Sequence, residues 1–168
     1  MRKNLFDEWV SEPIDFAQEI VKEFQTQDGI RFAPNLNKIK GFNYWNNQKF
    51  PGNFTGHLIY CIYKDGDPVY VGCSRNVQGL RDRMGRFCCQ LTGKTKTAGE
   101  HPGAKKYKKI FKEDYSNLYV KYSQITKNLP DGIKLEEIEY EIIRILKPIC
   151  NNEIYKSNWT AMARLELA

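Results

Sequence analysis

The pattern of apolar and polar positions divides the chain into short elements, and the clearest are two apolar runs near its middle. His57–Tyr63 and Pro68–Gly72 are rich in β-branched and aromatic residues, and the pair Asp65-Gly66 lies between them. An Asp-Gly pair flanked by such runs is the strongest short-range signal for a β-hairpin. The pattern therefore predicts two antiparallel strands with Tyr60 and Tyr70 near their middles.

Apolar residues recur at helical spacing in other stretches, which predicts helices over about residues 13–24, 76–88, 103–113 and 133–146. Alternation over Asn117–Ile125 predicts a third strand. The sequence thus predicts an α+β fold, with a three-stranded antiparallel sheet (the hairpin plus the third strand) flanked by helices and an N-terminal helical extension. The expected divisions are an N-terminal helix and arm over residues 1–55, a core over 56–152 and a C-terminal tail over 153–168 that packs on the core.

The stretch Asn35–Thr55 has no clear period and combines asparagine, lysine and glycine with aromatic residues. It is either an ordered loop or holds a short extra strand. One interpretation is a lid over the core. The other is an arm that contacts nucleic acid, because aromatic rings interleaved with lysines suit base stacking and phosphate contact.

The formal net charge of +6 is concentrated just after the hairpin. Between Arg81 and Lys112 only Asp82 and Glu100 oppose a long series of basic residues. Such a segment favours a polyanionic partner. We expect double-stranded DNA to be contacted by Arg86, Lys94, Lys96, Lys105, Lys106, Lys108 and Lys109.

Several function classes are disfavoured by what the sequence lacks. The five cysteines form no CxxC pair, which is typical of free thiols in a reducing compartment. No apolar run has the length of a membrane span and no apolar leader follows Met1, so we expect a cytoplasmic protein with no membrane partner. Gly93-Lys94-Thr95 lacks the earlier glycine of a P-loop, since Cys88 stands there, so no nucleotide cofactor is expected.

The predicted last helix carries an acidic residue beside an apolar stripe. Leu135, Ile138, Ile142, Ile145 and Leu146 define this stripe, and Glu139 has Leu135 four positions before it and Ile142 and Ile143 three and four positions after it. A carboxylate there is costly unless it is paired, protonated or bound to a cation. The alternative is a residue at the edge of the stripe that reaches solvent.

Taken in order, these features resemble the GIY-YIG nuclease superfamily. The resemblance spans about residues 56–152 and rests on the hairpin with Tyr60 and Tyr70-Val71-Gly72, the arginine-bearing helix, and Glu139 followed by Pro148 and Asn151. It implies an endonuclease that hydrolyses phosphodiester bonds with Mg²⁺ (or Mn²⁺), most like a compact restriction-type enzyme. A homodimer is the expected assembly if both DNA strands are cut.

The resemblance also implies roles for individual residues. Tyr60 would act near the attacking water as a general base or orienter, Tyr70 would hydrogen-bond around the nucleophile, and Glu139 would hold the cation, with Asn151 in the same catalytic set. Either Arg81 or Arg83 would clamp the phosphate. Counting from Tyr70 favours Arg81, whereas the large apolar residue expected after the arginine favours Arg83, which Met84 follows. We prefer Arg83.

One family feature is missing. Many members carry a histidine four residues after the arginine, but Phe87 stands four after Arg83 and Gly85 four after Arg81. His57, on the first strand, is the candidate to take that role, and His101 falls in the predicted basic loop. The gap keeps two alternatives open: a non-catalytic nucleic-acid-binding module on a decayed nuclease scaffold, and a structure-specific or RNA-directed nuclease.

Overall fold

The computed structural model describes residues 12–33, 50–51, 56–75, 79–92, 101–125 and 129–151. Most of the predicted arm, the basic residues Lys94 and Lys96, and the C-terminal tail over 153–168 lie outside these described residues.

The predicted hairpin is confirmed. Strands β2 (His57–Lys64) and β3 (Asp67–Ser74) pair antiparallel, with Tyr60 opposite Gly72. Asp65 and Gly66 both have positive φ angles, 52° and 90°. Two successive positive φ angles are the signature of the tight turn that matches the twist of a hairpin.

The hairpin belongs to a larger antiparallel sheet in the order β1-β4-β2-β3. Strand β4 (Leu118–Ile125) pairs with β2, and β1 (Ile30–Phe32) pairs with the outer side of β4. The α+β class is confirmed, but the described residues form four strands where the sequence predicted three. The additional strand, β1, is only three residues long, which is too short to give a periodic pattern.

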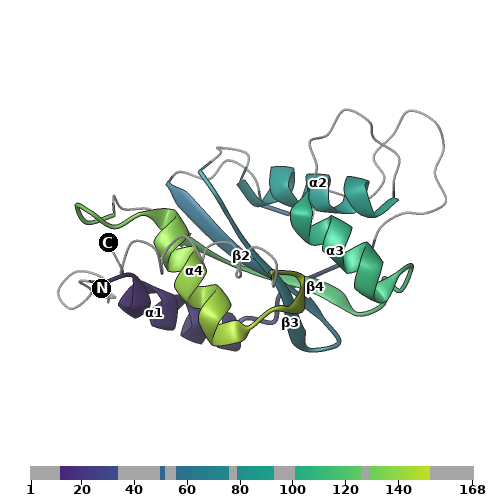
Figure 1. Ribbon diagram of the computed structural model, residues 1–168, viewed down its shortest axis with the longest axis horizontal. Helices are drawn as coiled ribbons and strands as arrows, with labels where there is room; N and C mark the ends of the chain where they lie inside the picture. The colour runs from purple at the N-terminus through teal and green to yellow at the C-terminus, as the bar shows by residue number, and fades with distance from the viewer. Residues whose placement is uncertain are drawn as a thin grey trace, which may run out of the picture.

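Two pairs of helices cover the two faces of the sheet (Figure 1). Helices α1 (Pro13–Thr26) and α4 (Leu135–Leu146) pack together on one face. Helices α2 (Gly79–Thr92) and α3 (Pro102–Phe111) pack together on the other. Within the described part of the chain, no helix is both long and apolar enough to cross a membrane.

Each face of the sheet has its own hydrophobic core. Leu58, Tyr60 and Ile62 of β2 point toward α2 and α3, whereas Ile59 and Cys61 point toward α1 and α4. This alternation follows from the two-residue period of a strand. Because β3 is an edge strand that borders both cores, groups from the two helix pairs can meet along it.

The helix predicted over about residues 76–88 corresponds to α2, on which Leu80, Met84, Phe87 and Cys88 are fully buried. The apolar stripe predicted for the last helix is wrong at one position, since Ile145 is 40% exposed. Ile110 of α3 is also exposed, at 36%. Both lie in the last turn of their helix, where the apolar face extends beyond the core that covers it.

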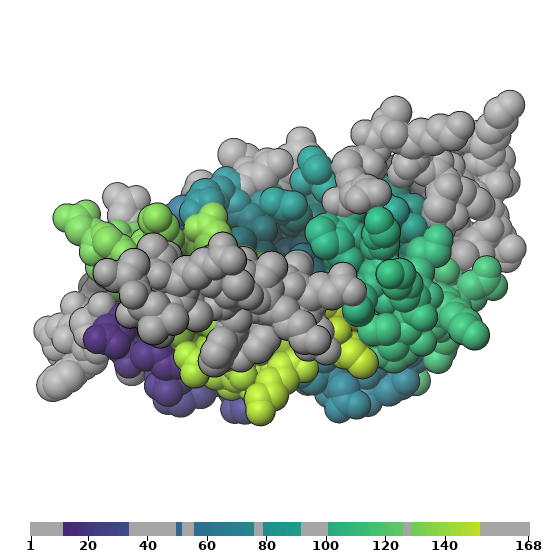
Figure 2. Space-filling view, in the orientation of Figure 1, coloured from purple at the N-terminus to yellow at the C-terminus, as the bar shows by residue number. Residues whose placement is uncertain are grey.

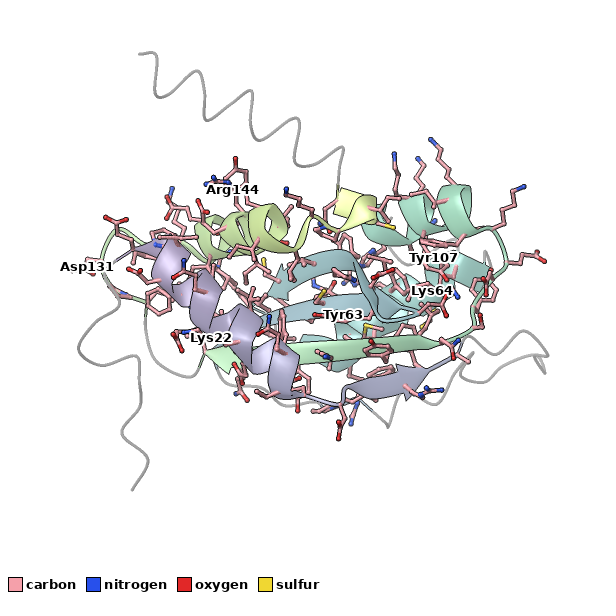
Figure 3. All side chains as sticks on the ribbon, turned by 90° about the horizontal axis from the view of Figure 1, so that it is seen from below. Lys22, Tyr63, Lys64, Tyr107, Asp131 and Arg144 are labelled. Carbon is pink, nitrogen blue, oxygen red and sulfur yellow. The ribbon has the colours of Figure 1, made fainter. Side chains whose placement is uncertain are left out.

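The turn end of the hairpin is fixed to the segment that follows α3. The Lys64 side chain is 3% exposed, and its ammonium group donates to the Asp65 carboxylate at 2.8 Å and to the Ser116 carbonyl at 2.7 Å. The Tyr107 hydroxyl of α3 donates to the Asp114 carbonyl in the same segment. Figure 3 shows Lys64 and Tyr107 at this end of the molecule. These contacts hold α3 in place beside the hairpin.

Candidate active site

The two tyrosines of the hairpin lie on the same face of the sheet, with ring centroids 6.2 Å apart. Tyr60 is only 1% exposed. Its ring lies across the backbone of β3, because a Cβ atom at Gly72 would be 2.5 Å from the Tyr60 hydroxyl oxygen. A glycine at position 72 is therefore what allows Tyr60 to occupy this place.

A second glycine makes room for Tyr70. Gly103, at the start of α3, packs so closely on the Tyr70 ring that a Cβ atom there would overlap it. The start of α3 thus forms a wall of the space around the two tyrosines. No functional role was predicted from the sequence for the start of α3.

His101 is the site residue that sequence reasoning missed. It is the N-cap of α3, where its Nδ1 accepts a hydrogen bond from the backbone N–H of Ala104 at 3.2 Å. Its Nε2 lies 3.3 Å from the Tyr60 hydroxyl oxygen, and the side chain is buried. Pro102 was the available signal, because proline favours the first position of a helix and so marks the preceding residue as a cap.

The His101 ring packs on two aromatic rings. Its centroid is 5.0 Å from that of Tyr70 and 5.3 Å from that of Phe87, both in edge-on geometry. Phe87 stands where the resemblance to the nuclease superfamily predicts a histidine, four residues after Arg83. The His101 imidazole, from the start of α3, therefore lies next to the position on α2 where that histidine was expected.

The two candidate arginines have different surroundings. The Arg81 guanidinium donates from Nε to the Phe50 carbonyl at 3.1 Å, so Arg81 ties α2 to the segment before the hairpin. Arg83 is close enough to both tyrosines for its positive charge to lower their pKa. The buried Nε of Arg83 has no hydrogen-bond partner among the described residues. Of the two arginines, Arg83 is the one whose charge acts on the pKa of both tyrosines.

Glu139 approaches the same region from the other face, around the edge strand. Its Oε2 accepts a hydrogen bond from the Cys73 thiol of β3 at 3.1 Å. Burial raises the pKa of the Glu139 carboxyl above its ordinary value, and the neighbouring Glu136 adds to this, while the Cys73 hydrogen bond and Arg83 oppose it. The Glu139 charge in turn raises the pKa of both Tyr70 and Tyr60.

The residues present fit a hard divalent cation. No cluster of three or more histidine, cysteine or acidic side chains suited to a metal occurs in the described ranges, so a closed zinc-type site is not formed there. Mg²⁺ is commonly bound through one or two carboxylates together with waters and substrate phosphates. Glu139, which is half-buried, is the carboxylate of the candidate site that would serve as such a ligand.

Asn151 lies on the outer side of β3 and not against the tyrosine hydroxyls. Its Oδ1 accepts from the Val71 N–H at 2.8 Å, and its Nδ2 donates to the Val71 carbonyl at 2.9 Å. The side chain is 1% exposed and takes the place of a neighbouring strand. Asn151 therefore positions the strand that carries Tyr70.

His57 lies away from the tyrosines. It is three residues before Tyr60 on the same strand, so the two side chains leave opposite faces of the sheet. Within the part of the chain that the structure describes, the buried His57 Nδ1 has no hydrogen-bond partner. The structure does not bring His57 close to the tyrosines, so His57 does not replace the missing family histidine in the way expected from the sequence.

The hydroxyl and imidazole groups of the site are held in their uncharged forms. Burial raises the pKa of Tyr60 and Tyr70 well above the ordinary value for a phenol, and the Tyr70 charge adds to the effect on Tyr60. Burial, together with the charges of Arg83 and Arg86, lowers the pKa of His101 to about 4. The arrangement can therefore orient hydroxyl protons beside one guanidinium group and one carboxyl group.

Among the described residues, four lysines of the predicted basic segment lie on α3. Helix α3 is at the right of the space-filling view (Figure 2). Lys105, Lys108 and Lys109 are exposed, and Lys106 is half-buried. Arg86 of α2 pairs with Asp82 at 3.2 Å. The lysines of α3 therefore stand on the helix that also supplies His101.

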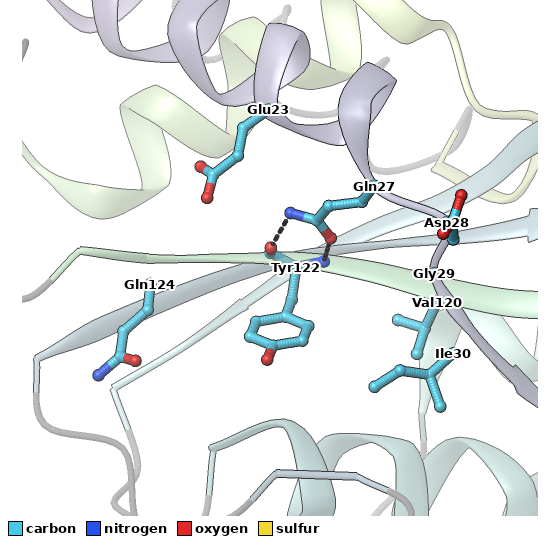
Figure 4. Close-up of a pocket in the computed structure, with 8 residues that line it drawn as sticks. All are labelled: Glu23, Gln27, Asp28, Gly29, Ile30, Val120, Tyr122 and Gln124. Carbon is cyan, nitrogen blue, oxygen red and sulfur yellow. Dashed lines mark hydrogen bonds between the residues drawn. The ribbon is translucent and has the colours of Figure 1, made fainter.

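An open pocket of about 400 Å³ lies elsewhere, between the end of α1 and β4 (Figure 4). In it the Gln27 side chain donates to the Tyr122 carbonyl at 2.7 Å and accepts from the Tyr122 N–H at 3.1 Å. None of the candidate site residues is among the described residues that line this pocket. It does not mark the candidate active site.

No protein-family model, curated protein or solved structure matches this chain. The resemblance to the GIY-YIG nucleases thus rests on the motif residues themselves.

Proposed function

We propose that this chain is a Mg²⁺-dependent DNA endonuclease of the restriction type. The observation that carries the proposal is the meeting of four groups that are far apart in sequence. Tyr60, Tyr70, Arg83 and Glu139 come from β2, β3, α2 and α4. The charges of Arg83 and Glu139 act in opposite directions on the pKa of both tyrosines.

Their chemistry suits hydrolysis of a phosphodiester bond. This reaction needs an oriented water and stabilisation of the negative charge that builds up on the phosphate. The tyrosine hydroxyls would orient the water, and the Arg83 guanidinium would hold a phosphate oxygen. Glu139 would hold Mg²⁺ or Mn²⁺, which would supply positive charge at the scissile phosphate.

The substrate we propose is double-stranded DNA, held by the lysine surface of α3. Exposed lysines on one helix give a sequence-independent attraction to phosphates. That helix begins at Pro102, between its N-cap His101 and Gly103, which contact Tyr60 and Tyr70. The same element would therefore bring the DNA backbone and the tyrosines together.

One observation favours a second candidate, a non-catalytic nucleic-acid-binding module. Tyr60 is 1% exposed, so its hydroxyl meets neither water nor phosphate unless the site opens. A decayed nuclease could retain such a tyrosine for packing alone while α3 continued to bind nucleic acid.

The test is a cleavage assay on supercoiled plasmid with Mg²⁺ and with EDTA. Glu139→Gln is compared with Glu141→Gln, a change on the same helix that removes the ion pair with Arg144. We expect discrete fragments with the wild type and with Glu141→Gln, and none with Glu139→Gln or EDTA. Smearing or nicking would indicate a nonspecific or structure-directed nuclease, and preferential cleavage of RNA an RNA-directed one. A gel shift without any cleavage would support the binding module.

A further inference from the structure

We infer that His101 is a positioning residue of this site. Its neutral imidazole donates the Nε2–H to the Tyr60 hydroxyl oxygen, so the hydroxyl proton of Tyr60 points away from His101. The inference rests on the proposed function, and it names a residue that the sequence did not connect with the tyrosines.

The direction of the hydrogen bond follows from the other nitrogen of the ring. Nδ1 accepts from the Ala104 N–H at 3.2 Å, and a nitrogen that accepts carries no proton. A neutral imidazole has one N–H, which must then be on Nε2. Since Nε2 is 3.3 Å from the Tyr60 oxygen, His101 is the donor and Tyr60 the acceptor.

This direction has a chemical consequence. A phenol hydroxyl is both a donor and an acceptor, and here its acceptor side faces His101. His101 therefore does not take a proton from Tyr60. It fixes the hydroxyl so that its proton points to the other side, where a water or phosphate oxygen would accept it once the buried site opens.

The protein holds the imidazole in this state. The ring packs edge-on against Tyr70 and against Phe87, and Pro102 and Gly103 follow His101 at the start of α3. Burial and the charges of Arg83 and Arg86 disfavour the protonated ring. His101 is thus neutral at the pH of a working nuclease, with its position set from several sides.

Two substitutions separate capping from positioning. In His101→Asn, the new side chain would place its Oδ1 where Nδ1 stands, so this variant keeps the helix cap but is too short to reach Tyr60. His101→Gln places a donor NH₂ the same number of bonds from Cβ as Nε2, but glutamine is a poorer cap. The two variants therefore reproduce different nitrogens of the same ring.

We expect His101→Asn to fold with some loss of stability, because the ring contacts with Tyr70 and Phe87 are removed. It should lose about tenfold or more in kcat, with little change in KM. His101→Gln should retain more of the kcat than His101→Asn in spite of its poorer cap. The opposite order, with the asparagine variant fully active, would mean that His101 is only a helix cap and would overturn the inference.

A second measurement does not depend on activity. The chain has two histidines, so ¹⁵N-labelled histidine gives two sets of NMR signals, and His57→Gln assigns them. We expect the Nε2–H tautomer for His101. If the wild type cleaves DNA but His101 is the Nδ1–H tautomer, the positioning role of His101 is overturned while the proposed function stands. Absence of cleavage by the wild type under all conditions overturns the proposed function, and the positioning role with it, whatever the tautomer.

Discussion

The Cα atom of Gly103 lies directly against the ring of Tyr70, with no space for even a methyl group between them. Gly72 stands in the same relation to Tyr60. Each tyrosine of the hairpin is therefore packed on the backbone of another element, β3 in one case and α3 in the other. The α2–α3 half of the molecule is thus joined to the tyrosines by close packing as well as by the His101 hydrogen bond.

We expect Gly103→Ala to destabilise the protein. Helix propensity alone would favour alanine by about 1 kcal/mol. The overlap with Tyr70 should outweigh this and lower the free energy of unfolding by about 1–3 kcal/mol. Urea denaturation measures the change, with Lys109→Ala at an exposed position of the same helix as the control. An increase in stability would show that the Tyr70 ring can move aside.

Asn151→Ala should destabilise the fold and reduce cleavage. The substitution leaves the Val71 N–H and carbonyl without their partners at a buried position, which costs about 2 kcal/mol. Gln27→Ala removes a similar pair of hydrogen bonds from the part-buried backbone of Tyr122 and should cost less. Urea denaturation of both variants measures the two losses of unfolding free energy. Equal losses would contradict the inference that the Val71 backbone groups are more buried than those of Tyr122.

His101 makes stability depend on pH in a defined direction. Its pKa is about 4 in the folded chain and near its ordinary value of 6.5 in the unfolded chain. As the pH falls below 6.5 the unfolded chain takes up a proton that the folded chain does not. The stability present above this value is therefore lost progressively toward pH 4, by up to about 3 kcal/mol.

The measurement is the free energy of unfolding across this interval for the wild type and for His101→Asn. The variant has no imidazole at this position, so its stability should fall less steeply with acid. Parallel curves would mean that His101 titrates normally in the folded protein.

The lysine surface of α3 should determine how DNA binding responds to salt. Replacing Lys105, Lys108 and Lys109 with glutamine should reduce the log–log salt slope by about 0.9 for each phosphate that is no longer neutralised. The control is Lys22→Gln on α1, on the other face of the sheet, where Lys22 pairs with Glu19 at 3.0 Å. Equal slopes for the triple variant and the wild type would exclude α3 as the surface that binds DNA.

Much of the fold follows from local pattern. The Asp65-Gly66 turn, the two strands around it, the alternation of β4 and the buried face of α2 could all be predicted, because each is encoded within a few neighbouring residues. Strand β1 could not, since three residues give no period and its pairing with β4 is a long-range contact.

The site was predictable only in part, for a similar reason. Glu139 could be selected because a carboxylate within an aliphatic face is unusual in sequence alone. His101 could not, since its meaning depends on where α3 packs, and it lies 41 positions along the chain from Tyr60. The choice between Arg81 and Arg83 likewise depends on which side of α2 meets the hairpin, which counting along the chain does not give.

The amide of Asn151 has a consequence for assembly. Exposed edge strands invite pairing with another molecule, and β3 is an edge strand. Because Asn151 already satisfies the outward N–H and carbonyl of Val71, a second copy cannot extend the sheet past this residue. If, as we propose, two copies cooperate in cutting both strands of a duplex, they would associate by contacts other than extension of the sheet at Val71.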